Sequence, residues 1–313
     1  MANRKRLYHL AVVAIGWLAA LHGFASGQTG VDGYLRESKE LDGSRPESTC
    51  IVRDSLRRLM LVSDVDERDK MFRAFRVFYA DSVHRVAPAF LAGMDKYADD
   101  YERWAEARPG DSVQQFLKER PDIAEAGSRW FQCGFSMYDA EGSLYPAEDP
   151  AVLLSFADKL GSSLASYVRF RAEEDREIVV EDAALQVSWE QLRLKLERWE
   201  SFERGHPELP ETKAEMEPCI RSFASLYLFG SDNTPTLNWQ NGRIDPKLIA
   251  SWNEFATRDR SSRYHALISS LVTNVNEQKQ TISQKDRPLF ARFGMGDNFD
   301  QWWRFLQLRL TER

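Results

Sequence analysis

The chain has 313 residues, of which 43% are hydrophobic and 29% charged, and its formal net charge is −6. An acidic chain of this kind lacks the basic surface that nucleic-acid binding requires, so the sequence argues against a nucleic-acid partner. Its length suits one large domain or two small ones, with enough apolar residues for a real core.

The first 25 residues have the order of a secretory signal peptide. Arg4, Lys5 and Arg6 precede an apolar stretch that runs from residue 7 to about residue 20, and small residues follow around Ala25. We expect cleavage near Ala25, which would remove these three positive charges and leave an exported chain of net charge −9 without a stable membrane span. The alternative is an uncleaved inner-membrane anchor, because the apolar run is nearly long enough to cross a bilayer. Residues 26–45 would follow as a flexible segment.

Beyond residue 45, apolar residues recur every three to four positions, which predicts amphipathic helices. The clearest stripes are Met71, Phe72, Phe75, Phe78, Tyr79, Val83 and Val86; Leu185, Trp189, Leu192, Leu196 and Trp199; Leu248, Ile249, Trp252 and Phe255; and Phe299, Trp302, Leu306 and Leu310. Only Ile178–Val180 hints at a strand, and this run is too short to build a sheet. The predicted fold class is all-α.

Two Asp-Pro pairs predict helix starts. In Asp149-Pro150 and in Asp245-Pro246, the aspartate supplies an N-cap acceptor, and the proline takes the first helical position, where its missing N–H costs nothing. The segments that follow also resemble each other, since Phe156 in the first aligns with Trp252 in the second.

An internal repeat would explain this resemblance. Four further pairs share an offset of 86 residues: Phe116/Phe202, Pro121/Pro207, Glu125/Glu211 and Cys133/Cys219. We therefore expect a single helical domain over residues 46–313, built as an array of two or three degenerate helical repeats that stack like a solenoid, with units 46–115, 116–200 and 201–313. The alternative is that unrelated amphipathic helices resemble one another by composition.

The three cysteines, Cys50, Cys133 and Cys219, are too few for a disulfide scaffold, and an odd number leaves at least one thiol over. An oxidising compartment would permit one disulfide. We favour buried single thiols on equivalent helices, because a free cysteine packs as a small hydrophobe. The sequence leaves the choice open.

Motifs for catalysis or metal binding do not emerge. His84, His206 and His265 follow no zinc-binding spacing, so we predict no metal and no cofactor, and the catalytic residues of any enzyme stay unknown. Carboxylates are abundant, and a pair of them could hydrolyse a glycosidic bond if folding brought them together. Solvated helix faces explain most of them.

The most distinctive stretch is residues 230–244, GSDNTPTLNWQNGRI, where turn-forming residues surround one aromatic side chain. Such a loop can hold a sugar or a peptide. The candidate residues for ligand or partner binding are Asp232, Asn233, Asn238, Trp239 and Asn241. The alternative is a structural insertion whose tryptophan packs back into the core.

Together these patterns favour an exported helical binding or scaffolding protein of the bacterial envelope over an enzyme. Its partner would be a protein or an envelope polymer. The alternative is an all-α hydrolase that acts on envelope sugar or peptide through paired carboxylates. The sequence does not predict the ligand or the oligomeric state.

Overall fold

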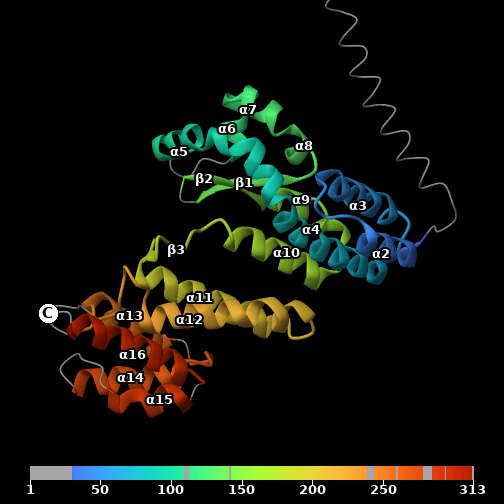
Figure 1. Cartoon of the computed structure of the whole chain (residues 1–313). Helices are drawn as coiled ribbons and strands as arrows, with labels where there is room; N and C mark the ends of the chain where they lie inside the picture. The colour runs from blue at the N-terminus through green and yellow to red at the C-terminus, as the bar shows by residue number, and fades with distance from the viewer. Residues whose placement is uncertain are drawn as a thin grey trace, which may run out of the picture. The chain divides into compact units, whose positions relative to one another are not determined.

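A computed structural model of the chain describes residues 30–108, 113–140, 142–237, 243–258, 260–277, 284–292 and 294–311. The described chain is predominantly helical, which confirms the predicted all-α class (Figure 1). The expected signal peptide, residues 1–25, lies outside the described residues. Within the described part, no helix combines the length and apolar character needed to cross a membrane.

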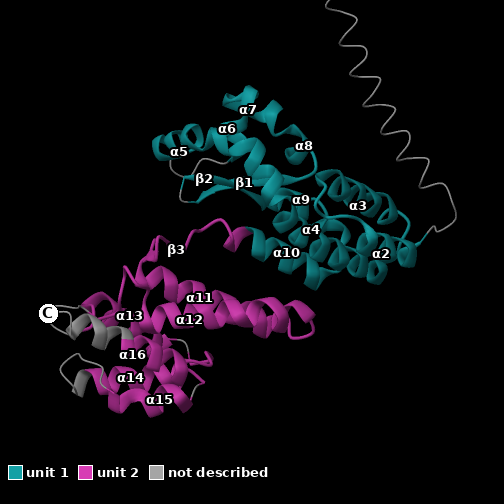
Figure 2. Cartoon of the chain, viewed as in Figure 1, with its two compact units in different colours: residues 1–172 teal, residues 173–313 magenta. Residues whose placement is uncertain are grey.

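The chain divides into two compact units, residues 1–172 and residues 173–313 (Figure 2). We call them the N-terminal unit and the C-terminal unit. Each contains its own buried aromatic side chains, among them Phe75 and Tyr79 in the first and Trp199 and Trp252 in the second. The sequence analysis expects one continuous domain from residue 46.

Helices build most of the N-terminal unit. Its elements are α2 (Val31–Glu40), α3 (Pro46–Leu59), α4 (Val65–Met94), a 3-10 turn (Asp95–Tyr97), α5 (Ala98–Ala107), α6 (Val113–Glu119), α7 (Pro121–Ala126), α8 (Ser128–Phe131), β1 (Phe135–Ala140), β2 (Ser143–Glu148), α9 (Pro150–Leu154), a second 3-10 turn (Ala157–Lys159) and α10 (Ser162–Glu174), whose last two residues belong to the C-terminal unit. Helix α2 lies inside the segment that the sequence analysis expects to be flexible.

Helix α4 is the long central element of this unit. It starts at a capping box in which the Asp64 side chain accepts from the Glu67 amide, and the Glu67 side chain accepts from the Asp64 amide. Its predicted apolar stripe is buried except for Val83, which is half-buried, and the ring of Phe75 contacts those of Tyr79 and Phe156. The 3.6-residue period of the sequence therefore identified this core face correctly.

A β-hairpin interrupts the helices of the N-terminal unit, and the sequence analysis missed it. Strands β1 and β2 pair antiparallel from Phe135↔Glu148 to Ala140↔Ser143. Gly142 lies in the turn with a φ of 76°, a conformation that glycine adopts at little cost. The predicted hint of a strand at Ile178–Val180 corresponds to a two-residue strand, β3 (Val180–Glu181), which pairs with β4 (Ala184–Leu185).

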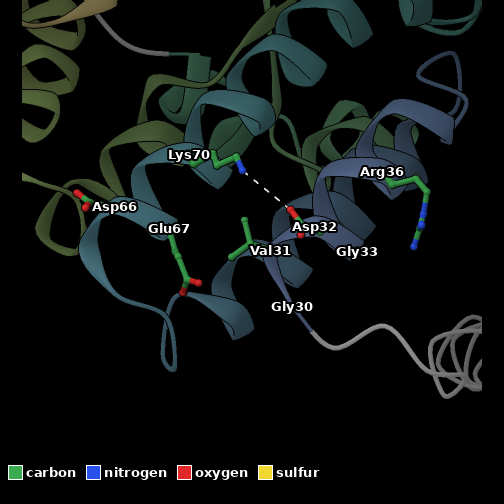
Figure 3. A pocket seen from close by; sticks show the side chains of 8 residues that line it. All are labelled: Gly30, Val31, Asp32, Gly33, Arg36, Asp66, Glu67 and Lys70. Atoms are coloured by element: carbon green, nitrogen blue, oxygen red, sulfur yellow. Dashed lines mark ion pairs between the residues drawn. The ribbon is translucent and has the colours of Figure 1, made fainter.

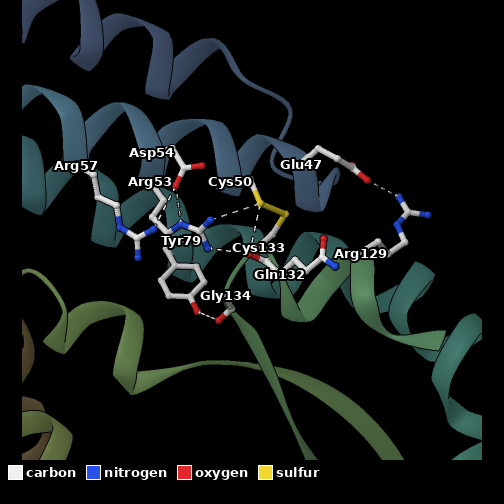
Figure 4. The surroundings of a disulfide bond; sticks show 10 residues. All are labelled: Glu47, Cys50, Arg53, Asp54, Arg57, Tyr79, Arg129, Gln132, Cys133 and Gly134. Carbon is white, nitrogen blue, oxygen red and sulfur yellow. Dashed lines mark hydrogen bonds and ion pairs between the residues drawn. A yellow bond between two sulfur atoms is a disulfide. The ribbon is translucent and has the colours of Figure 1, made fainter. Parts of the chain in front are cut away.

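A disulfide joins Cys50 in α3 to Cys133, which follows α8 (Figure 4). The expectation of buried single thiols is therefore wrong for these two cysteines. Folding brings their Cα atoms to 4.6 Å across 83 residues, a distance that suits a disulfide and that no local spacing could have predicted. A disulfide is typical of an oxidising compartment.

The C-terminal unit is also helical. After β3 and β4 it contains α11 (Trp189–Gly205), a π-helical turn (Thr212–Met216), α12 (Glu217–Phe229), α13 (Pro246–Arg258), α14 (His265–Glu277), a 3-10 turn (Gln284–Asp286), α15 (Arg287–Arg292) and α16 (Gly296–Thr311). Helix α11 carries the predicted stripe, with Leu192, Leu196 and Trp199 all buried.

The predicted helix starts are confirmed, whereas the repeat is not. Asp149 accepts a hydrogen bond from the Ala151 amide, and Asp245 accepts one from the Lys247 amide, as N-caps do. However, the proposed unit boundaries fall inside α6 and α11, and the paired cysteines occupy different settings. Cys133 lies in a turn before β1, and Cys219 lies within α12. The solenoid arrangement stays a prediction.

Candidate functional site

The C-terminal unit contains a hollow of about 460 Å³ between the starts of α11 and α13. We call it the α11–α13 hollow. Its volume falls in the range of small-molecule sites. It is lined by Leu185, Val187, Ser188, Trp189, Glu190, Thr234, Asp245, Lys247, Ala250, Ser251 and Glu254.

The predicted loop, residues 230–244, reaches this hollow through Thr234, and Asp245 follows the loop directly; neither was among the predicted site residues. Of those residues, Asp232 and Asn233 are exposed and do not line the hollow. Asn238, Trp239 and Asn241 lie outside the described residues.

Asn233 holds the turn of the β3–β4 hairpin. Its amide donates to the Ala183 carbonyl at 2.8 Å, and its side-chain Nδ2 donates to the Asp182 carbonyl. Asp182 and Ala183 have φ values of 47° and 54°, a left-handed conformation that most side chains disfavour. Next to it, the Thr234 hydroxyl accepts from the Leu185 amide at 3.0 Å, so the hairpin and the loop form one continuous edge of the hollow.

A side-chain hydrogen bond joins the two helix starts on either side of the hollow. The Trp189 indole donates from Nε1 to Asp245 Oδ2 at 3.0 Å, while Asp245 Oδ1 accepts from the Lys247 amide at 2.8 Å. Ser188 caps α11 through a capping box with Gln191. Each cap therefore satisfies backbone donors that a helix start would otherwise leave without a partner.

Ser251 forms the buried side of the hollow together with Tyr227, which lies behind it. Their hydroxyl oxygens are 2.7 Å apart, and Ser251 Oγ also lies 3.3 Å from the Trp189 carbonyl oxygen. Burial raises the pKa of Tyr227 well above its usual range, so this hydroxyl stays protonated. Ser251 Oγ is thus held by hydrogen bonds to the Tyr227 hydroxyl and the Trp189 carbonyl.

Glu254 links the hollow to a buried guanidinium. Arg193 is 2% exposed and lies 3.5 Å from Glu254, and it also pairs with Glu197 on its own helix. Arg258 contacts the same Glu254 oxygen at 2.8 Å. The Nε of Arg193 is buried and has no acceptor among the described residues.

The hollow combines an apolar side with a surplus of negative charge. Glu254 is already paired with Arg193 and Arg258, so the surplus comes from the carboxylates of Glu190 and Asp245 against the single ammonium of Lys247. Leu185, Val187 and Ala250 supply the apolar part. Such a lining suits a ligand with an amine or with several hydroxyl groups next to an apolar portion. The signal in the sequence that could have indicated this site is the pair of N-cap residues, Ser188 and Asp245. Only the fold shows that they lie close together.

A second recess of about 580 Å³ lies in the N-terminal unit, where α2 and α4 begin (Figure 3). Its lining includes Asp32 and Lys70, which lie 4.0 Å apart with side chains 100% and 61% exposed. Val31 is the only apolar side chain in the lining of this recess, which therefore lacks the apolar side of the α11–α13 hollow. We therefore take the α11–α13 hollow as the candidate site.

Within the described residues, no three His, Cys, Asp or Glu side chains come together as a metal site would require. The chain matches no protein-family model, and no curated protein or solved structure is significantly similar to it.

Proposed function

We propose that this chain is an exported binding protein of the bacterial envelope and that its ligand occupies the α11–α13 hollow. The observation that carries the proposal is the lining of this hollow, in which acidic and hydroxyl groups surround an apolar side. The matching ligand is a short peptide or an amino sugar that carries an amine.

Binding fits the geometry better than hydrolysis does. A glycosidase needs two carboxyl groups free to act on the substrate as acid and base or nucleophile. Here Asp245 accepts hydrogen bonds from Trp189 and Lys247, and Glu254 forms ion pairs with Arg193 and Arg258. These contacts fix the carboxylates as parts of the wall.

Export is supported by the Cys50–Cys133 disulfide and by the signal-like order of residues 1–25. Cell fractionation followed by mass measurement of the purified chain tests it. A mature protein that starts near residue 26 and is recovered outside the cytoplasm supports export. A full-length cytoplasmic protein with reduced cysteines contradicts it.

Ligand binding is tested by calorimetry with probes that carry a free amine, namely glucosamine disaccharides without N-acetyl groups and peptidoglycan stem peptides. We expect Glu190→Gln to weaken binding, because Glu190 is exposed and its removal lowers the negative charge of the hollow without disturbing the fold. Glu173→Gln is the matched control, since this exposed residue of the same unit does not line the hollow. Equal binding by both variants would place the ligand elsewhere.

A further inference from the structure

The β1–β2 hairpin of the N-terminal unit has one buried face and one outer face. Phe135, Met137, Leu144 and Pro146 are buried on the inner side. The residues of the other face are all exposed or half-buried, and strand register pairs them directly: Ser136 with Ala147, Tyr138 with Tyr145, and Ala140 with Ser143. We call these six residues the outer hairpin face.

Two tyrosines occupy the centre of this face. Tyr138 is 50% exposed, and its ring centroid lies 5.7 Å from that of Tyr145, with 29° between the ring planes. Serine and alanine on both sides are too short to cover the rings. The Tyr138 ring is therefore accessible to a ligand, together with the part of the half-buried Tyr145 ring that faces solvent.

A disulfide and several hydrogen bonds fix the base of the hairpin that carries these rings. An isolated two-stranded hairpin is at best marginally stable in water. Here the disulfide fixes Cys133, and Arg53 donates to the Gln132 carbonyl at 3.0 Å (Figure 4). The Tyr79 hydroxyl donates to the Gly134 carbonyl and accepts from the Asp149 amide at 2.8 Å, which closes the two ends of the hairpin.

A further contact holds the hairpin near its turn, where the Leu144 amide donates to Asp95 Oδ1 at 3.3 Å. The outer hairpin face is thus presented by a backbone fixed at both ends. A ligand surface gains from such preorganisation, because little conformational freedom is lost on binding.

The charge of the outer hairpin face selects the class of ligand. None of its six residues is charged, in a chain whose net charge is −6. A nucleic acid could stack on the rings but would find no cation for its phosphates among these six residues. A neutral ligand fits, and the hydroxyl groups of two tyrosines and two serines, which both donate and accept, match the hydroxyl groups of a sugar.

We propose that the outer hairpin face binds a neutral glycan strand, with pyranose rings stacked on Tyr138 and Tyr145. The C–H groups on one side of a pyranose contact the electron-rich face of a tyrosine ring. The neighbouring hydroxyls of Ser136 and Ser143 bind the sugar edge. This surface is separate from the α11–α13 hollow and does not depend on a ligand there.

The test uses the full mature chain with its disulfide intact and two probes: a hexamer of β-1,4-linked N-acetylglucosamine in calorimetry, and purified peptidoglycan in co-sedimentation. We expect Tyr138→Ala and Tyr145→Ala each to weaken hexamer binding about tenfold, the scale of one lost stacking contact. Tyr138→Phe and Tyr145→Phe keep the ring and should retain most of the affinity.

Val77→Ala is the control, because Val77 is 73% exposed in α4 of the same unit and should not alter binding. Glu190→Gln, in the α11–α13 hollow, should also leave hexamer binding unchanged, which separates this proposal from the proposed function. The proposal would be overturned if the wild type bound neither probe. It would also be overturned if the alanine variants bound as tightly as the wild type. Binding of a proline-rich peptide in place of the hexamer would also overturn it.

A second measurement does not depend on the folding of variants. Tetranitromethane nitrates exposed tyrosines, and peptide mapping locates the modified rings. Saturating hexamer should protect Tyr138 from nitration at least fivefold relative to protein alone, since a stacked sugar covers the ring. Unchanged nitration of Tyr138 in the presence of bound hexamer would place the glycan on another surface.

Discussion

Each of the two units is stabilised internally by a different kind of interaction. In the N-terminal unit, a disulfide and hydrogen bonds from Arg53 and Tyr79 fix the segment that leads into the hairpin. In the C-terminal unit, the fixing groups are buried charges on α11: Lys195 is 2% exposed against Glu174, and Glu200 is fully buried against Arg263. Similar helical compositions have thus reached stability by a covalent route and by an ionic one.

This difference predicts which perturbation should destabilise each unit. A reductant breaks a covalent link and leaves ion pairs intact. Removal of one buried charge instead leaves its partner without a counter-charge in a medium of low dielectric constant. Because two units need not unfold together, the predictions at Glu174 and at the disulfide use hydrogen exchange with mass spectrometry, which reads each unit separately.

The largest effect is expected at Glu174, the last residue of α10. Its carboxylate accepts from Lys195 Nζ at 3.0 Å, from Arg198 at 3.0 Å and from the Trp199 indole at 2.9 Å. Glu174→Ala leaves a buried ammonium largely uncompensated and should lower the stability of the C-terminal unit by about 3–5 kcal/mol. Exchange of α11 amides reports the loss.

Glu177 provides the matched control for this prediction. It contacts the same Lys195 nitrogen at 3.3 Å, but its side chain is 38% exposed. Because water screens an exposed pair, Glu177→Ala should cost less than about 1 kcal/mol. Equal losses in the two variants would show that burial does not set the strength of this network.

The next largest effect is expected from the disulfide. Replacing Cys50 and Cys133 together by serine, or reducing the wild type, should destabilise the N-terminal unit by about 2–4 kcal/mol, because the 83-residue loop regains freedom when unfolded. Dithiothreitol titration followed by hydrogen exchange measures this. Cys219→Ser should respond to reductant as the wild type does. Faster exchange in the C-terminal unit alone would break the comparison between the units.

Periodicity was enough to predict the helices but not their partners. The stripes on α4 and α11 and the caps at Asp149 and Asp245 depend on neighbours in sequence, so the sequence showed them correctly. The disulfide depends on contact across 83 residues, and a repeat hypothesis directed attention away from it. The β1–β2 hairpin was missed because Tyr138, Tyr145 and alanines occupy its outer face, so the strands lack an apolar–polar alternation, and because Pro146 argues against a strand.

The candidate site shows the same limit. The sequence singled out the 230–244 loop for its amides and its tryptophan, and the fold uses Asn233 to hold another turn. The residues that line the hollow from α11, Trp189 and Glu190, belong by pattern to an ordinary amphipathic helix. Their role depends on Asp245 lying 56 residues away, which helical periodicity does not predict.

A smaller effect is expected at Ala183, in the turn that Asn233 holds. A glycine removes the steric cost of a φ of 54°, and Asp-Gly suits a two-residue hairpin turn, so Ala183→Gly should stabilise the C-terminal unit by up to about 1 kcal/mol. Ala184→Gly, one residue on in β4, should destabilise it instead, because glycine weakens a strand. Thermal denaturation compares the two variants, and a loss in both would mean that the turn is unstrained.

The smallest effect is expected from the charge of Glu119 in the N-terminal unit, which is lost at low pH. The Arg108 guanidinium, helped by Gln115 and Trp104, lowers the pKa of Glu119 from 4.5 to about 2. A depressed carboxyl pKa stabilises the fold above the unfolded pKa, and this contribution is lost as the pH falls toward the folded value.

Glu119→Gln should therefore have a lower Tm than the wild type near pH 6, and the difference should shrink as the pH falls from 5 to 2. The Glu119 side chain is 34% exposed, so the whole effect is small. In an Arg108→Gln background the difference should nearly vanish at every pH, because the main cause of the shift is gone. A pH-independent difference would assign Glu119 a packing role. A positive result would mean that a charge interaction also stabilises the N-terminal unit, which leaves reductant as the perturbation specific to it.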